Sequence, residues 1–165
     1  MHLLKRNILV LAVIALLGAG CSAKKIGATY DPFVIFPTTA QWAWNTELIR
    51  IPKDPSMKTL NVQDFVQEAI TEGLAKRGYT LAPAGGKVDF RVHYQLGLGR
   101  EIKQDSVKSH ASISLTLVDA KTDRSAWVGF IKTGTDIAAP EAQRRKRLRE
   151  QMNKMLKNFP PSQPK

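Results

Sequence analysis

The sequence has a single cysteine, so no pair of cysteines is available for an internal disulfide or for a zinc site built from thiolates. Histidine is almost as scarce, with three residues in 165, which leaves few candidates for a metal centre or a general base. Acidic residues are outnumbered, because 14 Asp and Glu face 25 Lys and Arg. The stability of the fold must therefore come from packing, and the net charge of +11 favours anionic partners.

A long hydrophobic run is also missing. Residues 8–17 are apolar, but a helix that crosses a bilayer needs about 20 such residues, and two lysines follow soon afterwards. The run follows Lys5 and Arg6 and precedes the small residues 18–20. A basic start, a short apolar segment and small residues at the cut are typical of a secretory signal. The next residue is Cys21, which gives the arrangement of a bacterial lipoprotein signal.

We expect residues 1–20 to be a cleaved lipoprotein signal peptide and Cys21 to become the lipid-bearing first residue of the mature chain. Its sulfur would carry a diacylglyceryl group, with acyl chains such as palmitate. Each buried methylene contributes ~0.8 kcal/mol, so two or three long chains hold a protein essentially irreversibly. Ser22 rather than Asp follows the cysteine, which by resemblance to sorting in enteric bacteria favours the periplasmic face of the outer membrane over the inner membrane. The alternative is an ordinary cleaved signal followed by an unmodified cysteine.

We expect the mature chain to be organised as a tether and one domain. The expected parts are a tether over residues 21–25, a single domain over residues 26–159 and a flexible Pro-rich tail over residues 160–165. A fully extended tether of this length reaches only about 17 Å, so we expect the domain to lie close to the bilayer. Loss of residues 1–20 removes one Lys, one Arg and no acid, which lowers the net charge from +11 to +9.

Two kinds of hydrophobic pattern occur along the domain. Strict alternation predicts strands, most clearly over residues 87–98 and 109–119. An apolar stripe with helical spacing predicts a helix over residues 62–77, which Asn61 caps and Gly78 ends. Half-apolar strands are typical of a sheet covered on one side, so we expect an α+β fold with two helices on one face of a small, mainly antiparallel β-sheet. The other predicted elements are strands over residues 26–30, 38–44 and 125–133 and a helix over residues 141–158.

Seven short motifs stand in a recognisable order along the domain. They are Tyr30-Asp31-Pro32, Trp42-Ala43-Trp44, Leu74 to Tyr79, Asp89 to Tyr94, Val118-Asp119-Ala120, Trp127-Val128-Gly129 and Phe159-Pro160-Pro161. Together they resemble the bacterial envelope lipoprotein family called domain of unknown function 4136, over nearly all of the mature chain. The resemblance implies an envelope lipoprotein with a compact α+β domain, and it supplies no catalytic residues. Residues 99–108 form a short charged connection where relatives often have a longer Gly-rich one.

Basic residues crowd the start of the last predicted helix. Over residues 140–165 eight Lys and Arg stand against two Glu, which accounts for +6 of the mature charge of +9. The apolar stripe of this helix, extended backwards, puts Arg145 on the buried side. The candidate residues for binding an anionic surface are Arg144, Arg145, Lys146, Arg147 and Arg149.

Two interpretations of this basic run are open. In the first, the charges are only solvated. Glu141 partly matches Arg145, and Glu150 partly matches Lys146 or Lys154. Asp64, Glu68 and Glu72 of the first helix could also neutralise a neighbouring basic helix. In the second, they bind an anionic partner: phospholipid headgroups, lipopolysaccharide, peptidoglycan or an acidic envelope protein. Nucleic acid has the right charge but lies in the wrong compartment.

A polar face of the predicted strands carries two histidines, two serines and an aspartate. Ser and His are the ingredients of a hydrolase, but no Gly-x-Ser-x-Gly nucleophile elbow is present. The histidines and the aspartate would hold a metal only if the histidines were cross-strand neighbours, and a catalytic zinc site needs three ligands. Such residues are also typical of a solvated sheet face, so we expect no enzyme activity, no cofactor and no metal site. The residues are Asp89, His93, His110, Ser112 and Ser114.

Large aromatic residues are the third candidate. Alternation puts Trp42 and Trp44 on the same side of their strand, and Trp127 lies in a later one. Tyr30 and Phe33 complete the set. Core packing explains such residues in a small domain, and the alternative is a ligand groove for an acyl chain or a glycan.

These observations lead to one functional hypothesis and two alternatives. We expect a lipid-anchored periplasmic lipoprotein that acts as a non-catalytic envelope accessory or interaction module, with its basic last helix facing an anionic surface. The first alternative is a carrier that binds a lipid or glycan in a pocket between helices and sheet. The second is a hydrolase.

Overall fold

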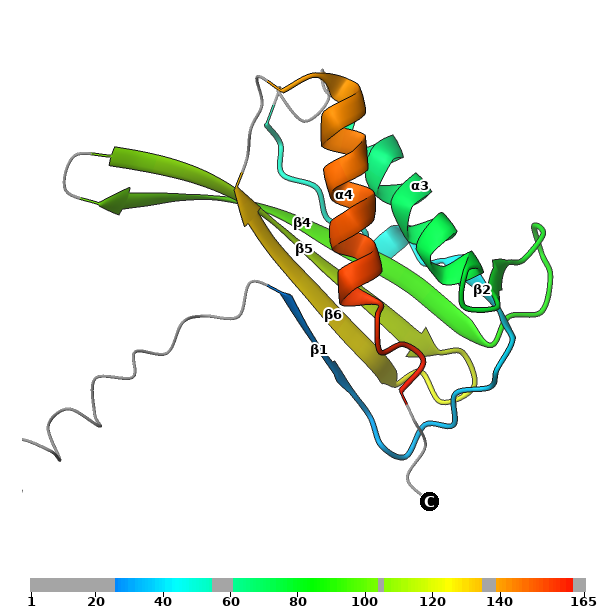
Figure 1. Ribbon diagram of the computed structural model, residues 1–165. Helices are drawn as coiled ribbons and strands as arrows, with labels where there is room; N and C mark the ends of the chain where they lie inside the picture. The colour runs from blue at the N-terminus through cyan, green and yellow to red at the C-terminus, as the bar shows by residue number, and fades with distance from the viewer. Residues whose placement is uncertain (1–25, 55–60, 104–105, 135–138, 162–165) are drawn as a thin grey trace, which may run out of the picture.

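The computed structural model describes residues 26–54, 61–103, 106–134 and 139–161 (Figure 1). The predicted signal peptide and tether, residues 1–25, lie outside the described residues. The strands are β1 Ile26–Tyr30, β2 Ala40–Trp44, β3 Tyr79–Leu81, β4 Phe90–Lys103, β5 Ser106–Asp119 and β6 Ser125–Gly134. The helices are α3 Val62–Ala75, α4 Glu141–Met155 and a short 3-10 helix, η1, Thr46–Leu48.

The six strands form one sheet in the order β1-β6-β5-β4-β2-β3. The neighbours β1–β6, β6–β5 and β5–β4 pair antiparallel, whereas β2 runs parallel to both β3 and β4. Helices α3 and α4 lie side by side on one face of this sheet (Figure 1). The predicted α+β class, with two helices on one face of a mainly antiparallel sheet, is confirmed. Strand β3 and its parallel pairing were not predicted.

Of the two signals predicted at the ends of α3, the stop at Gly78 is confirmed and the cap at Asn61 is wrong. Gly78 has φ +81°, and a side chain there would put its Cβ 2.6 Å from the Thr38 carbonyl oxygen. The left-handed stop predicted at Gly78 is therefore confirmed, and it turns the chain back into the sheet at β3. Asn61 precedes α3, but its side chain makes no capping hydrogen bond. Its own φ of 49° accounts for this, because an N-cap side chain reaches the helix from an extended backbone.

The core between helices and sheet is rich in aromatic rings. Phe159 packs edge-on against Tyr79, with ring centroids 4.9 Å apart, and against Trp127 at 5.2 Å. The last helix ends at Met155, and its predicted end at residue 158 is therefore wrong. The chain must turn there for Phe159 to enter the core, and the buried Pro161 extends the packed domain two residues beyond the predicted boundary.

The connection predicted over residues 99–108 is also wrong, because residues 99–103 belong to β4 and residues 106–108 to β5. Strands β4 and β5 stay paired from Phe90 and Asp119 out to Lys103 and Ser106. Strand β6 accompanies β5 only as far as the pair His110–Gly134, so the end of the β4–β5 hairpin projects from the sheet as a two-stranded arm (Figure 1). Charged residues do not stop such pairing, because backbone amides and carbonyls, rather than side chains, make the hydrogen bonds between strands.

Candidate functional site

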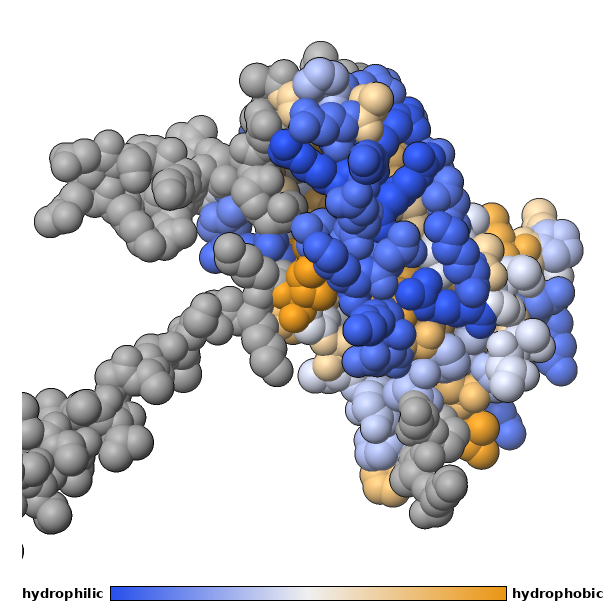
Figure 2. All heavy atoms as spheres, viewed as in Figure 1, coloured by the Kyte–Doolittle hydropathy of each residue, from blue (hydrophilic) through white to orange (hydrophobic). Residues whose placement is uncertain are grey.

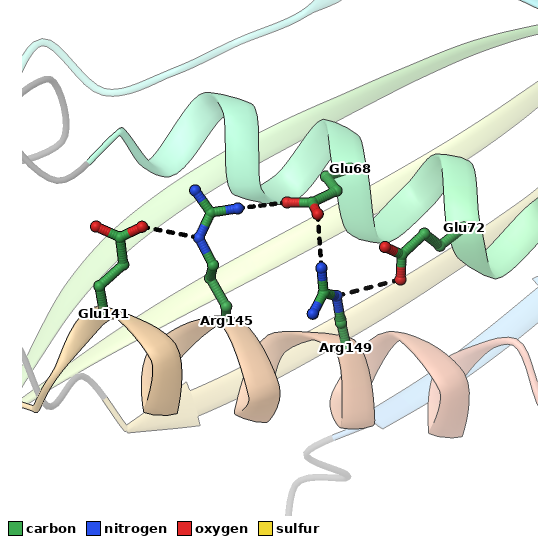
Figure 3. Close-up of polar contacts among 5 residues, drawn as sticks. All are labelled: Glu68, Glu72, Glu141, Arg145 and Arg149. Atoms are coloured by element: carbon green, nitrogen blue, oxygen red, sulfur yellow. Dashed lines mark hydrogen bonds and ion pairs between the residues drawn. The ribbon is translucent and has the colours of Figure 1, made fainter.

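Two arginines of the basic run reach from α4 to the acidic face of α3. Arg145 contacts Glu68 at 2.5 Å and Glu141 of its own helix at 2.9 Å. Arg149 contacts Glu68 at 2.6 Å and Glu72 at 3.1 Å. Figure 3 shows the resulting network, in which Glu68 lies between the two guanidinium groups. The predicted pairing of the basic helix with acids of the first helix is therefore confirmed for Glu68 and Glu72.

The Arg145 guanidinium also stacks on an aromatic ring. Its central carbon lies 3.7 Å from the centroid of the Phe65 ring. The side chain of Arg145 is 33 % exposed, which agrees with its predicted place on the buried side of the helix. Since Arg145 and Arg149 have carboxylate partners within the domain, we assign both a role in holding α4 against α3.

The rest of the basic run faces outward to different degrees. Arg144 is half-buried and donates a hydrogen bond from Nη1 to the Ala139 carbonyl at 3.0 Å. Lys146 and Arg147 are exposed. Two further exposed lysines, which count toward the basic charge of residues 140–165 but stand outside the predicted run, lie further along α4 and just past its end. The basic ridge, as we define it, consists of Lys146, Arg147, Lys154 and Lys157.

Helical spacing explains why Lys146, Arg147 and Lys154 form one surface, and Lys157 follows three residues later, just past the end of α4. Residues three and four apart lie on the same side of a helix, and Glu150, which shares that side, is the only acid in the set. Figure 2 shows a continuous hydrophilic surface over α4 in this view. The basic ridge therefore presents four cations against one carboxylate, which suits contact with an anionic surface.

Strand β1 lies beside the last turns of α4. A side chain at Gly129 would put its Cβ 2.8 Å from the Sδ atom of Met155, and Gly129 pairs with Ala28 of β1. Helix α4 packs on β1 and β6, as Figure 1 also shows. The point where the tether would enter the domain, at Ile26, is two residues from Ala28 and therefore lies closer to the last turns of α4, which carry Lys154, than to its first turns (Figure 1).

The polar sheet face does not bring the histidines together. His93 lies opposite Thr116 and His110 opposite Gly99, so six residue positions, or about 20 Å, separate them along the strands. His93 and His110 are therefore not the cross-strand neighbours that a metal site at these residues would require. Asp89 accepts a hydrogen bond from the Gln41 amide at 2.8 Å, which uses it to join β2 to β4. Within the four described ranges no three His, Cys, Asp or Glu side chains gather as a metal site.

His93 is the buried member of this face. Only 9 % of the residue is exposed, and among the described residues its Nδ1 atom has no hydrogen-bond partner. Burial, reinforced by the positive charge of Arg50, lowers the pKa of His93 below its ordinary value of 6.5. The folded protein therefore favours neutral His93.

We predict a matching loss of stability in weak acid. Below about pH 6.5 the unfolded chain takes up a proton that folded His93 resists, so the free energy of unfolding falls as the pH drops. Above that pH this residue contributes no slope. Urea unfolding of the wild type and of His93→Gln between pH 7.5 and pH 5 measures the effect, and the variant should show the shallower slope. An equal reduction in the control His110→Gln would contradict the assignment.

The three tryptophans lie in two separate parts of the core. Trp42 is 0 % exposed and its ring meets Trp44 edge-on at 4.8 Å, which confirms that the two share one side of β2. Trp127 is 2 % exposed and lies on β6. Strands β4 and β5 separate β2 from β6, so the tryptophans are about 14 Å apart across the sheet. Their neighbours are core side chains, and a ligand groove at these residues stays a prediction.

None of the described helices is both long and apolar enough to span a bilayer. The fold itself has counterparts among solved structures. A PDZ domain protein from Parabacteroides distasonis matches with TM-score 0.54 and 12% identity over 84% of this chain, which corresponds to 36% of that chain. The PelC dodecamer from Paraburkholderia phytofirmans matches with TM-score 0.51 and 10% identity over 79% of this chain and 93% of that chain.

A third solved structure leads to the family. It is a DUF4136 family protein from Bacteroides thetaiotaomicron, with TM-score 0.51 and 13% identity over 82% of this chain and 95% of that chain. Identities this low show a shared fold alone, and no curated protein matches the sequence. The sequence profile described as domain of unknown function (DUF4136) matches residues 27–161. This match spans α3, α4 and all of the sheet except Ile26, and the chain therefore belongs to the DUF4136 family.

Proposed function

We propose that this protein is a lipid-anchored lipoprotein of the bacterial envelope, attached through Cys21 at the periplasmic face of the outer membrane. The observation that carries the proposal is the N-terminal pattern: a basic start, residues 8–17 apolar, small residues, and then the sole cysteine. Strand β1 begins at Ile26, five residues after Cys21, which suits a domain held close to a membrane.

Within this proposal the basic ridge orients the domain rather than attaching it. Two or three acyl chains already hold a protein essentially irreversibly. Near an anionic surface each Lys or Arg adds about 1 kcal/mol, which is enough to favour one orientation among several. The nearness of β1 to the last turns of α4 supports this role, because the tether would bring Lys154 and Lys157 toward the headgroups.

We further propose that the domain is a non-catalytic accessory or interaction module. Support comes from the separation of His93 and His110 along the sheet and from the use of Asp89 in joining two strands. A general base needs its nucleophile within hydrogen-bond reach, and the Nδ1 atom of His93 has no such partner among the described residues.

Metabolic labelling with a fatty-acid probe tests the proposal. The wild type is expected to take up the probe and to fractionate with the outer membrane. Cys21→Ser should lose the label completely, because no other cysteine is available to carry the thioether. Ser22→Asp is the matched control, since it should keep the label and move the protein to the inner membrane. Undiminished labelling of Cys21→Ser would refute the proposal.

A further inference from the structure

Two large apolar side chains stand out on the surface between β1 and β2. Phe33 is 85 % exposed and Ile35 is 78 % exposed, well above any other large hydrophobic residue that the structure describes. They alternate with Val34 and Phe36, which are buried in the core. Single exposed apolar residues are ordinary on a protein surface, but two that share one side of a short loop indicate a contact site.

The loop of residues 31–37 holds these side chains in place. The Asp31 carboxylate accepts a hydrogen bond from the Phe33 amide at 2.9 Å and pairs with Arg124 at 3.1 Å. The Asp31 amide donates to the Ala126 carbonyl at 2.9 Å, which ties the loop to β6. At the other end Phe36 stacks on Phe90, with ring centroids 5.7 Å apart. The loop is therefore ordered before any partner binds, which lowers the entropic cost of binding.

The position of the loop points to the bilayer as the partner. Strand β1 lies at the edge of the sheet, and the loop follows it directly. The strand spans about 13 Å between its end residues, which is less than the reach of about 17 Å of the tether that precedes it. The tether is therefore long enough to let the strand lie along the membrane. A domain lying with its β1 edge on the membrane would touch the surface at both ends of this strand.

The proposed attachment at Cys21 also favours a bilayer over a separate protein as the partner of the loop. A lipid anchor keeps the membrane within reach of the loop at all times, so the second contact is intramolecular and needs little affinity of its own. Helix α4, which carries the basic ridge, packs on β1 and β6. Phe159, two residues after Lys157 of the basic ridge, packs edge-on against Phe36 of the loop, with ring centroids 5.8 Å apart. Exposed aromatic and aliphatic side chains with cations nearby are the combination that binds the headgroup–acyl boundary of a membrane.

We propose that the loop of residues 31–37 is a second membrane contact, which inserts Phe33 and Ile35 into the interfacial region of the bilayer that holds the acylated Cys21. This inference rests on the proposed lipid attachment. Two contacts fix the rotation of the domain relative to the membrane, which a single flexible tether cannot do.

A fluorescent probe on the lipidated protein tests the inference. Acylation leaves no free thiol at Cys21, so Ile35→Cys offers one site for an environment-sensitive label such as NBD. In vesicles of phosphatidylethanolamine and phosphatidylglycerol, the label at position 35 should shift its emission to the blue and be quenched by lipids with nitroxide-labelled chains. Phe33→Cys should behave alike. Leu81→Cys is the matched control, because Leu81 is 46 % exposed and lies on β3 at the opposite edge of the sheet; its label should show neither effect.

The outcomes separate this inference from the proposed function. A protein that floats with vesicles but whose labels at positions 33 and 35 are quenched no more than the label at position 81 overturns the membrane contact and leaves the lipid anchor in place. A protein that does not float with the vesicles contradicts both. Unfolding curves show whether the labelled variants keep the fold, which we expect because both side chains are exposed.

Discussion

Replacing Trp42 with alanine is expected to lower the free energy of unfolding by about 3–5 kcal/mol, which is the range for removing a large aromatic side chain from a packed core. The residue is fully buried, and its Nε1 atom donates a hydrogen bond to the Tyr79 carbonyl at 3.2 Å. Its loss would leave a cavity beside Trp44 and would strip the Tyr79 carbonyl of that partner. Urea unfolding followed by circular dichroism measures the change.

The same variant separates a packed core from a ligand groove. Trp42→Phe keeps most of the volume and should cost clearly less than the alanine substitution, because only the hydrogen bond and part of the ring are lost. If Trp42 instead lined an open groove, alanine would cost less than about 1 kcal/mol, as surface substitutions do. Such a small loss would contradict the core role and would favour the lipid or glycan carrier.

Charge reversal at Glu68 is expected to have the next largest effect. Glu68→Lys removes the ion pairs with Arg145 and Arg149 and places a third cation between them. Ion pairs that are partly exposed contribute about 0.2–1 kcal/mol each, and repulsions of similar size replace them, so we expect a loss of about 2 kcal/mol. Added salt should recover part of the loss, since it screens exposed charges.

The control for Glu68 is a glutamate away from the basic helix. Glu47 is exposed in η1, and Glu47→Lys should change the free energy of unfolding by less than about 0.5 kcal/mol. Thermal unfolding at low and high salt compares the two variants. Equal effects at both positions would show that Arg145 and Arg149 contribute only general charge, and the assignment of a structural role to them would then be wrong.

Much of the fold follows from local patterns in the sequence. The predicted bounds of β1 and β6 agree with the structure to within a residue, and the stop predicted at Gly78 agrees with its left-handed backbone. Strand β3 was missed because three residues are too few to show alternation, and its parallel pairing with β2 depends on α3 crossing over the sheet. Hairpin pairing beyond residue 98 was missed because charged residues hide the alternation that marks a strand.

The candidate site shows the same division between local and long-range information. Helical spacing alone placed Arg145 on the buried side, and it identified Glu68 and Glu72 as partners for the basic helix. The separation of Arg145 and Arg149 from the exposed Lys146 and Arg147 depends on how α3 and α4 pack, which no local pattern encodes. For the loop of residues 31–37, alternation indicates two faces but not which one the core covers.

The central claim is the lipid on Cys21, and the intact mass of the mature protein extracted from the envelope tests it most directly. We predict a chain that begins at Cys21, without residues 1–20, and carries a diacylglyceryl thioether, with fatty acids released by alkaline hydrolysis. A mature chain whose intact mass shows no lipid, and whose cysteine reacts with maleimide, would contradict the proposed lipid attachment. Retention of residues 1–20 on the extracted protein would contradict it equally.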